Sequence, residues 1–528
     1  MACDFEVSNM GIESAERNVP RLIEVDLPIR QISANSSREK SVRDGHISTL
    51  HIWWARRPLG ACRAVVCATL WPDPAHPDCP ESFVRDASQI LRRLQGQIGG
   101  RKFEWGEPLQ IREALLSFIA QFSDWDNTCR REFLEASRAL TASAHAALGG
   151  SPGTSPLIVD PFAGGGSIPL EASRVGGEAF ASDLNPLPVL LNKVIIEFIP
   201  KYGKRLASEL RNVSARVQEA AWKEIVQYFP PSHGTEPPVA YLWARQVTCE
   251  GPGCGVSIPL IRSLLLAKRG ASSVGLGLAF NSSKNEIEVK ISTGGSFGPG
   301  TVKRGSASCP ACGYTTPVAS VRRQLGQQHG GADSSRLLAV VCRSGGSKSY
   351  HPPTEADLAA VRRVLADTVR SEALAPQELP LMSGVFNAPI YGMTRWDLLF
   401  SARQLLVADA IGKAIEAALA AREASGSDPE FEGALRVLLL FARGKYLDFR
   451  STLCGWISTG EKIGHTFGRQ ALGMIFDWTE GSPFGDMSGS WQRSYDAIAD
   501  FIEHESSCEN QRGSVSLADA TDHPLPDG

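Results

Sequence analysis

The chain has 528 residues, which predicts two to four structural units rather than a single core. With 43% hydrophobic and 21% charged residues it resembles ordinary folded proteins, and its net charge of −3 restricts any polyanion-binding surface to a local patch. No apolar run reaches about 18 residues and no basic start precedes an apolar core, so we expect neither a membrane span nor a secretory signal. Without secretion, the cysteines indicate thiols or metal ligands in a cytoplasmic protein rather than a disulfide framework.

The first predicted segment, residues 1–95, carries a basic and aromatic block. Between Arg30 and Arg63 there are seven Lys or Arg and only two Asp or Glu, with tryptophans and histidines interleaved. The run "PLGACRAVVCATLW" is apolar and opens at Pro58, which predicts a buried helix. Residues 96–155 contain two amphipathic runs and end in "GGSPGTSP", so we expect a helical insertion closed by a turn.

A strand, a loop, a helix and a second strand open the next predicted segment, residues 156–240. "LIVD" (157–160) is a short apolar run, "PFAGGGS" is a glycine loop, and "IPLEASRVG" predicts a helix. "EAFASD" (178–183) predicts the second strand. This order of elements is typical of the opening of a parallel α/β sheet.

The glycine loop lies between Asp160 and Asp183, two acids that each end a predicted strand. Glycines at 164–166 permit positive φ and a close approach of the backbone to a ligand. No lysine follows them, which argues against a nucleoside-triphosphate loop, and Pro169 stands where a dinucleotide fingerprint needs a third glycine. A nucleoside whose ribose hydroxyls bind Asp183 remains. The alternative is a tight turn without a ligand.

Two cysteine pairs in the predicted segment 241–350 have the spacing of metal-binding knuckles. Cys249 and Cys254 stand in "TCEGPGCG", and Cys309 and Cys312 stand in "SCPACGY". Four thiolates from two knuckles make a closed tetrahedral zinc site, which is structural because it leaves no open position for catalysis. The long interval between the pairs implies a β insertion. The alternatives are two unrelated thiol pairs, or Cys342 as a substitute ligand.

Several stretches of the chain resemble one family of enzymes. "DPFAGGGSIPLEA" followed by "SDLNP" resembles the S-adenosylmethionine loop of amino-group DNA methyltransferases. "REKSVRDGHISTLHIWWARRPLGACRAV" resembles the N-terminal block of the adenine-specific DNA methylases that contain a zinc ribbon. The resemblance continues through "CPACGYTTPVASVRRQ", "TRWDLLFSARQLL" and "TFGRQALGMIFDW", and so covers most of the chain.

This resemblance implies a cofactor, S-adenosylmethionine, together with a fold and a set of binding residues. The implied fold is α/β, a partial doubly wound Rossmann-like methyltransferase sheet with a zinc-ribbon insertion and helical additions. The loop would cradle the cofactor, Asp183 would bind its ribose, and the basic and aromatic block would close over its methionine end. The further residues concerned are Asp160, Phe162, Gly164 and Gly166 in the loop, and Ser48, Thr49 and His51 in the block.

The catalytic motif of that family, of the form Asp/Asn/Ser-Pro-Pro-Tyr/Phe, is not found in this sequence. "FPPSH" and "HPPTE" lack the required neighbours, and "NAPIYG" (387–392) is a distant imitation. In the resembled family the motif follows an "LPLPDGS"-like turn, and this chain stops at "HPLPDG". We therefore expect residues 351–505 to be helical and residues 506–528 to begin a truncated second half of the core. The helical patterns are "EADLAAVRRVLADTVR" (355–370), "ARQLLVADAIGKAIEAALAAREA" (402–424), "GALRVLLLFARGKYLDFRSTL" (433–453) and "SWQRSYDAIADFIEH" (490–504). "SVSLADA" predicts a short strand that stops at Asp519.

The sequence thus predicts an S-adenosylmethionine-dependent DNA methyltransferase of the adenine N6 class, in a truncated or split form. Its partners would be DNA and a second polypeptide that carries the missing motif, and this chain alone would be inactive. The alternative is a non-catalytic DNA-binding or regulatory subunit of a restriction or phage-defence system. The sequence leaves open whether adenine or cytosine is the target base.

Overall fold

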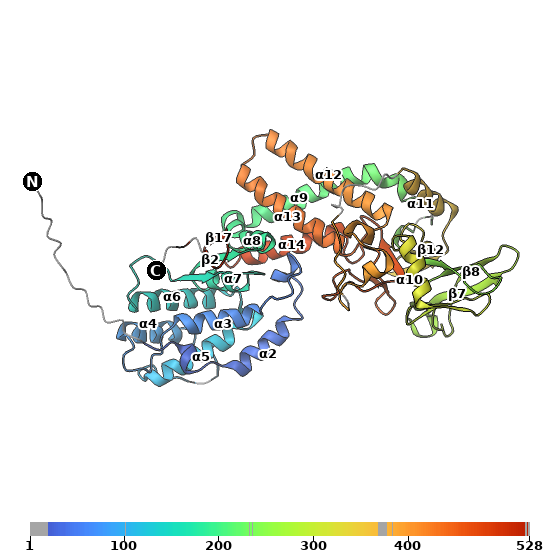
Figure 1. The fold of residues 1–528 in the computed structure, drawn as a ribbon. Helices are drawn as coiled ribbons and strands as arrows, with labels where there is room; N and C mark the ends of the chain where they lie inside the picture. Colours follow the sequence, from blue (N-terminus) through green and yellow to red (C-terminus); the bar gives the residue numbers. More distant parts are fainter. Residues whose placement is uncertain are drawn as a thin grey trace, which may run out of the picture. The chain divides into compact units, whose positions relative to one another are not determined.

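The chain forms two compact units, shown as a ribbon in Figure 1. The computed structural model describes residues 19–100, 102–231, 233–234, 236–367, 377–382, 384–522 and 525. The first unit contains residues up to 48, residues 55–204 and residues from 502 onward, and the second contains 49–54 and 205–501. Both units combine helices with small sheets, which confirms the mixed α/β class. The six finer segments drawn from the sequence remain predictions.

The sheet of the first unit has three parallel strands. Their order is β1 (Leu157–Asp160), β2 (Glu178–Asp183) and β17 (Ser514–Leu517). Helix α7 (Ser167–Arg174) connects β1 to β2, so the predicted strand, loop, helix and strand are confirmed. Strand β17 arrives from the other end of the sequence, and a helix-connected parallel pair therefore gains its third strand from residues more than three hundred positions away.

The end of the last strand differs from the sequence prediction. We expected a strand that runs to Asp519, but β17 ends two residues earlier, at Leu517. The Asp519 carboxylate instead accepts a hydrogen bond from the backbone N–H of Thr521 (2.9 Å), which favours a turn over continued strand pairing. Residues 1–18 of the first predicted segment, and Pro524, Pro526 and Gly528 of the terminal turn, lie outside the described residues.

The helices of the first unit share an apolar cluster. Phe118, Phe122 and Phe133 lie at its centre, with ring centroids 5.3–5.7 Å apart. The segments expected to be helical in residues 96–155 are confirmed as two of these helices. The helices that contribute to the cluster are α1 (Leu22–Val25), α2 (Ile29–Glu39), α3 (Leu59–Leu70), α4 (Glu81–Arg92), α5 (Pro108–Phe122) and α6 (Arg131–Ala147). The first unit also contains α8 (Pro186–Asn192) and the π-helical turn η3 (Lys193–Phe198).

Helix α3 begins after Pro58, as the sequence predicts, and its first turn is closed by a side chain from α2. The carboxylate of Glu39 accepts hydrogen bonds from the backbone N–H groups of Leu59 (2.8 Å) and Gly60 (3.0 Å). These N–H groups have no partner inside the helix, so a buried carboxylate is well matched to them. A Cβ at residue 60 would lie 2.1 Å from the carbonyl oxygen of Ser123, and glycine is therefore required there.

Four charged side chains form a buried network in the first unit. Arg63 on α3 donates to both carboxylate oxygens of Glu171 on α7 (2.7 and 3.3 Å). Arg174 donates from Nε to Glu171 (2.9 Å) and from Nη2 to Glu505 (2.8 Å). Each of the four is at most 1% exposed. Two positive and two negative groups alternate in this network, so its charge is balanced inside the protein.

Glu505 shows the electrostatic effect of this pairing. Burial alone would raise its pKa, but the guanidinium of Arg174 and the neighbouring His504 lower it to about 2. Because the pKa in the folded protein is below that in the unfolded chain, the ionised Glu505 stabilises the fold above about pH 4.3, the ordinary glutamate pKa, and this contribution is lost as the pH falls toward 2.

The second unit is built on a four-stranded antiparallel sheet. Its order is β13 (Ser347–His351), β12 (Arg336–Ser344), β3 (Pro238–Ala244) and β16 (Asp477–Gly481). Smaller sheets surround it: β4 (Gln246–Thr248) with β5 (Ser257–Pro259), β6 (Leu265–Ala267) with β7 (Val274–Asn281) and β8 (Glu286–Thr293), β9 (Val302–Lys303) with β10 (Ser306–Ser308) and β11 (Thr315–Thr316), and β14 (Trp456–Ile457) with β15 (Lys462–Ile463). The β insertion expected between the cysteine pairs is therefore confirmed.

The region expected to be helical, residues 351–505, is only partly so. It contains α11 (Glu355–Asp367), α12 (Ala402–Ala424), α13 (Pro429–Asp448) and α14 (Trp491–Ser506), but also strands β14 to β16. We expected a helix through residue 453, and α13 stops at Asp448 because the carbonyl of this residue accepts from the N–H of Thr466 (2.7 Å). The remaining long helices are α9 (Ile199–Ile225), which has a non-helical Gly203, and α10 (Val318–Gln327).

Among the described residues, no helix has both the length and the apolarity needed to cross a membrane. Cys129 and Cys508 form a disulfide that the sequence analysis did not predict. Its two partners are 379 residues apart, and only the fold brings them together.

We predict that Glu505→Gln lowers the free energy of unfolding by about 3–5 kcal/mol at neutral pH, because it leaves buried Arg174 without a full counter-charge. The advantage of the wild type over the variant should shrink below about pH 4.3, since protonation of Glu505 in the unfolded chain then removes its contribution. Urea unfolding at several pH values measures both effects.

A matched control is Glu135→Gln, which removes a carboxylate from an exposed pair with Arg131 on α6. Solvent screens such a pair, so we expect no measurable change. Equal losses for both variants, or a pH-independent difference between wild type and Glu505→Gln, would show that the buried network does not stabilise the unit.

Candidate functional site: a glycine loop and a four-cysteine cluster

The glycine loop of the first unit turns sharply between β1 and α7. Gly164 and Gly166 have φ values of 48° and 80°, in the left-handed region that glycine adopts most readily. A Cβ at residue 166 would lie 2.8 Å from Cδ1 of Ile195 and 2.9 Å from Oδ1 of Asn192. The sequence prediction that the loop needs its glycines is therefore confirmed at these two positions.

Asp183, the predicted ribose ligand, holds the loop in place. Its Oδ2 accepts from the backbone N–H of Gly164 (3.0 Å), and its Oδ1 accepts from that of Asn185 (2.9 Å). Each carboxylate oxygen has two acceptor positions, so one on each oxygen is left for a hydroxyl group. The structure thus brings the loop and the second strand-end acid together, as the spacing predicts.

Asp160, the first strand-end acid, lies beside the same turn. Its Oδ1 accepts from the backbone N–H of Phe162 (3.1 Å). Burial raises its pKa above the ordinary value, and the negative charge of Asp183 raises it further. Two neighbouring carboxylates therefore favour a ligand that donates hydrogen bonds or carries positive charge.

Large apolar side chains are exposed where the three strands end. Phe162, after β1, is 77% exposed, Leu184, after β2, is 72% exposed, and Leu517, the last residue of β17, is 60% exposed. The carboxyl ends of parallel strands are where open α/β sheets bind ligands. Apolar groups placed next to two carboxylates suit a ligand with both an aromatic ring and hydroxyl groups.

Asn192 is a residue of this site that the sequence analysis missed. It is fully buried at the end of α8, and its Nδ2 donates to the carbonyl oxygens of Gly164 (3.1 Å) and Pro188 (2.9 Å). Its Oδ1 is buried with no hydrogen-bond partner among the described residues. Such an acceptor beside the turn is one that a bound molecule can satisfy. In the sequence, its place in the helix that follows the second predicted strand is the only signal that could have suggested this role.

Part of the basic and aromatic block lies against the loop. The Ser167 hydroxyl, at the first position of α7, donates to the carbonyl of Arg57 (2.9 Å). Ser48 forms a hydrogen bond with His46 (2.9 Å), and His46 with Glu39 (3.1 Å), the residue that caps α3. The expectation that the block adjoins the loop is therefore supported through Arg57, whereas Ser48 belongs to the α3 cap.

Thr49 and His51, the other two predicted block residues, belong to the second unit. There the carbonyl of Thr49 accepts from Nζ of Lys445 (2.9 Å), and the ring of His51 lies 6.1 Å from that of Phe441. Burial lowers the pKa of Lys445 to about 8 and also lowers the pKa of His51. Their predicted role over the methionine end of a cofactor remains a prediction.

The four cysteines of the two knuckles converge in the second unit. The sulfurs of Cys249 and Cys312 are 3.6 Å apart, those of Cys254 and Cys309 are 3.8 Å apart, and all four lie within 4.8 Å of one another. These separations are those of thiolates around one tetrahedral ion. The predicted grouping is confirmed, and the cluster can hold a metal ion.

Glycines shape each knuckle so that backbone groups face the sulfurs. The N–H of Gly251 points at Sγ of Cys249 (3.4 Å), and Gly253, Gly255 and Gly313 have φ values of 70°, 63° and 76°. Strands β4 and β5 flank the first pair, and β10 and β11 flank the second. Four sulfurs with donor N–H groups and no carboxylate match the donor set of a structural zinc site.

Cys342, weighed as a substitute ligand, lies elsewhere. It is fully buried in β12, where it pairs with Ser349 across the sheet, and it is not one of the four clustered cysteines. Burial raises the pKa of its thiol to about 12, so it stays protonated and behaves as a small apolar side chain.

"NAPIYG", the distant imitation of the catalytic motif, forms a short 3₁₀ helix, η6 (Ala388–Tyr391), in the second unit. Tyr391 is buried in the apolar cluster that also contains Cys249 and Cys309, edge-on to Phe476. A tyrosine fixed in this way cannot stack on a substrate base. The segment is part of the core around the cysteine cluster.

Comparison with known proteins assigns no activity to this geometry. The family described as "Protein of unknown function (DUF1156)" matches residues 26–93, which include Glu39, Arg57 and Arg63. Neither a curated protein nor a solved structure matches the chain. The matched segment supplies the cap of α3, the carbonyl bound by Ser167, and the first arginine of the buried network.

We predict that the purified protein contains about one zinc ion per chain and that Cys309→Ser releases it. Loss of the ion should loosen the knuckles, so amide hydrogen exchange should accelerate in residues 246–316 and stay unchanged in β1 and β2. Elemental analysis and exchange mass spectrometry measure the two effects. Cys342→Ser is the matched control, since it removes a buried thiol and should keep the metal.

Freshly purified wild-type protein without zinc, or a Cys309→Ser variant that retains it, would contradict this assignment.

Proposed function

We propose that the protein is an S-adenosylmethionine-dependent DNA methyltransferase of the adenine N6 class, or the part of one that binds the cofactor. The observation that carries this proposal is the first unit's glycine loop, placed between two strand-end carboxylates and next to exposed apolar side chains. The finer architecture proposed with it is a partial, doubly wound, Rossmann-like sheet. The resemblance of the N-terminal block to adenine-specific methylases supports the choice of reaction.

In this proposal the loop binds the nucleoside part of the cofactor. The carboxylate of Asp183 accepts the two ribose hydroxyls while it keeps its bonds to the loop backbone. Phe162 and Leu184 offer apolar surface to the adenine ring. The bound cofactor would supply the methyl group, and Asp160 would favour its positively charged end.

The four-cysteine cluster has a structural task in the same proposal. Zinc held by Cys249, Cys254, Cys309 and Cys312 would tie β4–β5 to β10–β11. A folded ribbon of this type presents surface loops to a large partner. We propose that the partner is DNA.

A second candidate function is a non-catalytic DNA-binding or regulatory subunit of a restriction or phage-defence system. The observation that favours it is the absence of a Pro-Pro-aromatic motif from the sequence, together with the burial of Tyr391 in "NAPIYG". A second polypeptide that carries the motif would turn the same chain into one half of a split enzyme.

We predict that Asp183→Asn weakens S-adenosylmethionine binding by about tenfold or more, because a charge-assisted hydrogen bond contributes on the order of 1.5–3 kcal/mol. The asparagine keeps one acceptor for the loop, so the fold should survive. Calorimetric titration measures the affinity, with Asp126→Asn as a control at an exposed carboxylate. Unchanged affinity in Asp183→Asn would identify the loop as a turn without a ligand.

We also predict that this chain alone transfers no labelled methyl group from S-adenosylmethionine to mixed-sequence DNA. Transfer should appear when the product of the adjacent reading frame is added, if that polypeptide carries the Pro-Pro-aromatic motif. Tritium counting of the recovered DNA measures both. Transfer by the chain alone would show that it contains a catalytic motif. Cofactor binding without transfer, both by the chain alone and after the second polypeptide is added, would favour the regulatory subunit.

A further inference from the structure

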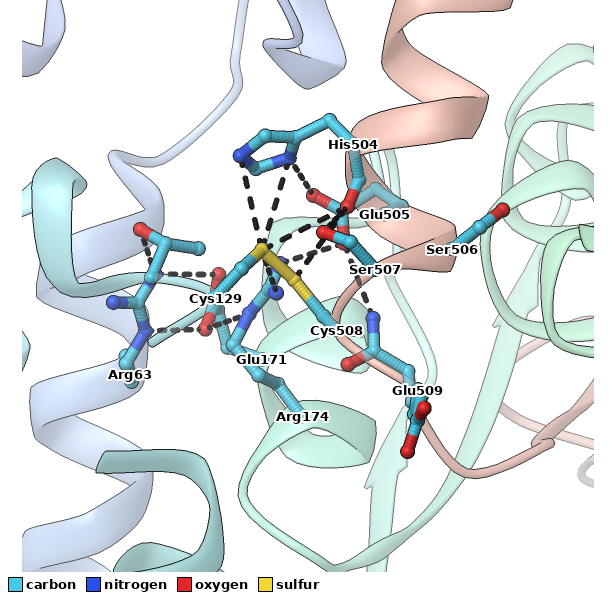
Figure 2. The surroundings of a disulfide bond; sticks show 12 residues. Arg63, Cys129, Glu171, Arg174, His504, Glu505, Ser506, Ser507, Cys508 and Glu509 are labelled. Atoms are coloured by element: carbon cyan, nitrogen blue, oxygen red, sulfur yellow. Dashed lines mark hydrogen bonds and ion pairs between the residues drawn. A yellow bond between two sulfur atoms is a disulfide. The ribbon is translucent and has the colours of Figure 1, made fainter. Parts of the chain in front are cut away.

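The disulfide between Cys129 and Cys508 joins two distant parts of the first unit (Figure 2). Cys129 lies just before α6, and Cys508 follows the end of α14. The two Cα atoms are 4.8 Å apart. Neither cysteine belongs to the metal-binding cluster, and neither has a role in the proposed methyl transfer.

Nitrogen-bearing side chains face one of the two sulfurs. Nε2 of His504 lies 3.7 Å from Sγ of Cys129, and Nη1 of Arg174 lies 3.8 Å from it. Figure 2 shows both side chains directed at this sulfur, with Glu171 and Glu505 on two sides of the Arg174 guanidinium. N–H donors and a guanidinium stabilise a thiolate, which is the reactive form of cysteine.

The two cysteines differ in their access to solvent. Cys129 is half-buried, whereas Cys508 is fully buried. A small oxidant therefore reaches Cys129 first, and Cys508 is placed to react with the product. Redox-responsive cysteine pairs have the same arrangement, in which one thiol reacts with the oxidant and the second then forms the disulfide with it.

The disulfide lies at the start of the segment 508–513, which leads into β17. Arg138 donates to the carbonyls of Cys508 (2.6 Å) and Glu509 (3.1 Å), and Ser173 donates to that of Gln511. The N–H of Gly513 then donates to the carbonyl of Ile196 (2.8 Å), one residue before the strand begins. These hydrogen bonds and the sulfur bond lie between the end of α14 and the first residue of β17 that pairs with β2.

We propose that Cys129 and Cys508 form a reversible redox clasp that fixes β17 against β2. The thiolate of Cys129 attacks a peroxide, which yields a sulfenic acid on Cys129 and releases water or an alcohol. The thiol of Cys508 then displaces the hydroxyl group as water, and the sulfur–sulfur bond forms. Two thiols lose two electrons and the peroxide O–O bond is reduced. A dithiol reverses the reaction.

The clasp acts on the strand whose last residue lies at the candidate ligand edge. Leu517 pairs with Asp183, and the N–H of Ala518 donates to the Asp183 carbonyl (3.3 Å). In the oxidised state the segment from Cys508 to β17 is tethered at its start, so β17 opens less often. The inference concerns the order of this strand and does not depend on methyl transfer.

Metal binding is the competing explanation for the same residues. Cys129, His504 and Cys508 have ligand atoms within 4.8 Å of one another, as a metal site requires. A disulfide uses both sulfurs and leaves the imidazole as a lone ligand, so the clasp and a metal ion exclude each other. The number of bound metal ions therefore separates the two.

The test uses the full-length protein with its zinc bound, reduced with dithiothreitol and then exposed to dilute hydrogen peroxide. Differential alkylation and peptide mapping should show a link between the peptides containing Cys129 and Cys508, which disappears on reduction. Cys79→Ser, which removes another buried thiol of the first unit, should leave the link unchanged. In Cys508→Ser, dimedone should trap a sulfenic acid on Cys129.

Amide hydrogen exchange of the wild type in both states gives a readout that needs no variant. Residues 514–517 should exchange about tenfold or more slowly in the oxidised state, because the tether lowers the probability of local opening. The clasp is overturned if both thiols remain alkylatable after peroxide, if exchange is the same in both states, or if the reduced protein holds a second metal ion that Cys508→Ser releases.

Discussion

The buried ion network of Arg63, Glu171, Arg174 and Glu505 is the interaction on which the first unit depends. It joins α3, the helix after the glycine loop, and the end of α14 through buried charges. Removing a carboxylate or a guanidinium from water costs free energy unless a group of opposite charge lies beside it. The fold must therefore assemble all three elements together, and the glycine loop at the start of α7 is positioned as a result.

The same network connects the matched segment 26–93 to the helix that follows the glycine loop. Arg63 reaches α7 from inside that segment, and Arg57 accepts the hydroxyl of Ser167 at the first turn of the same helix. Two contacts from one short stretch hold the first residue and the middle of α7. The segment is thus a support for the loop, and the residues that would touch a ligand lie on β1, β2 and their following turns.

Local signals in the sequence predicted the parts of the site that depend on neighbours in the chain. The glycines at 164 and 166, the strand-end acids Asp160 and Asp183, and the two cysteine knuckles all have the predicted structure, because turn geometry and ligand spacing are encoded within a few residues. Helices α11, α12 and α14 followed from their apolar periodicity in the same way.

Contacts between distant residues could not be predicted from one sequence. Strand β16 is flanked by loops in a region of helical patterns, and its pairing with β3 joins residues more than two hundred positions apart. The pairing of Glu171 with Arg63 and the bond between Cys129 and Cys508 have no local signature either, since any buried arginine or cysteine has several candidate partners. Asn192 was missed because its role depends on the turn that it faces, not on its own neighbours.

In the proposed function, the glycine loop and the two strand ends form a nucleoside site. Ultraviolet cross-linking of radiolabelled S-adenosylmethionine to the intact protein, followed by peptide mapping, tests this directly. The account predicts label in the peptides that span residues 157–192, with Phe162 and Leu184 as the side chains nearest the ring, and loss of the label when unlabelled cofactor competes. Label confined to the second unit, or label that competitor does not displace, would contradict it.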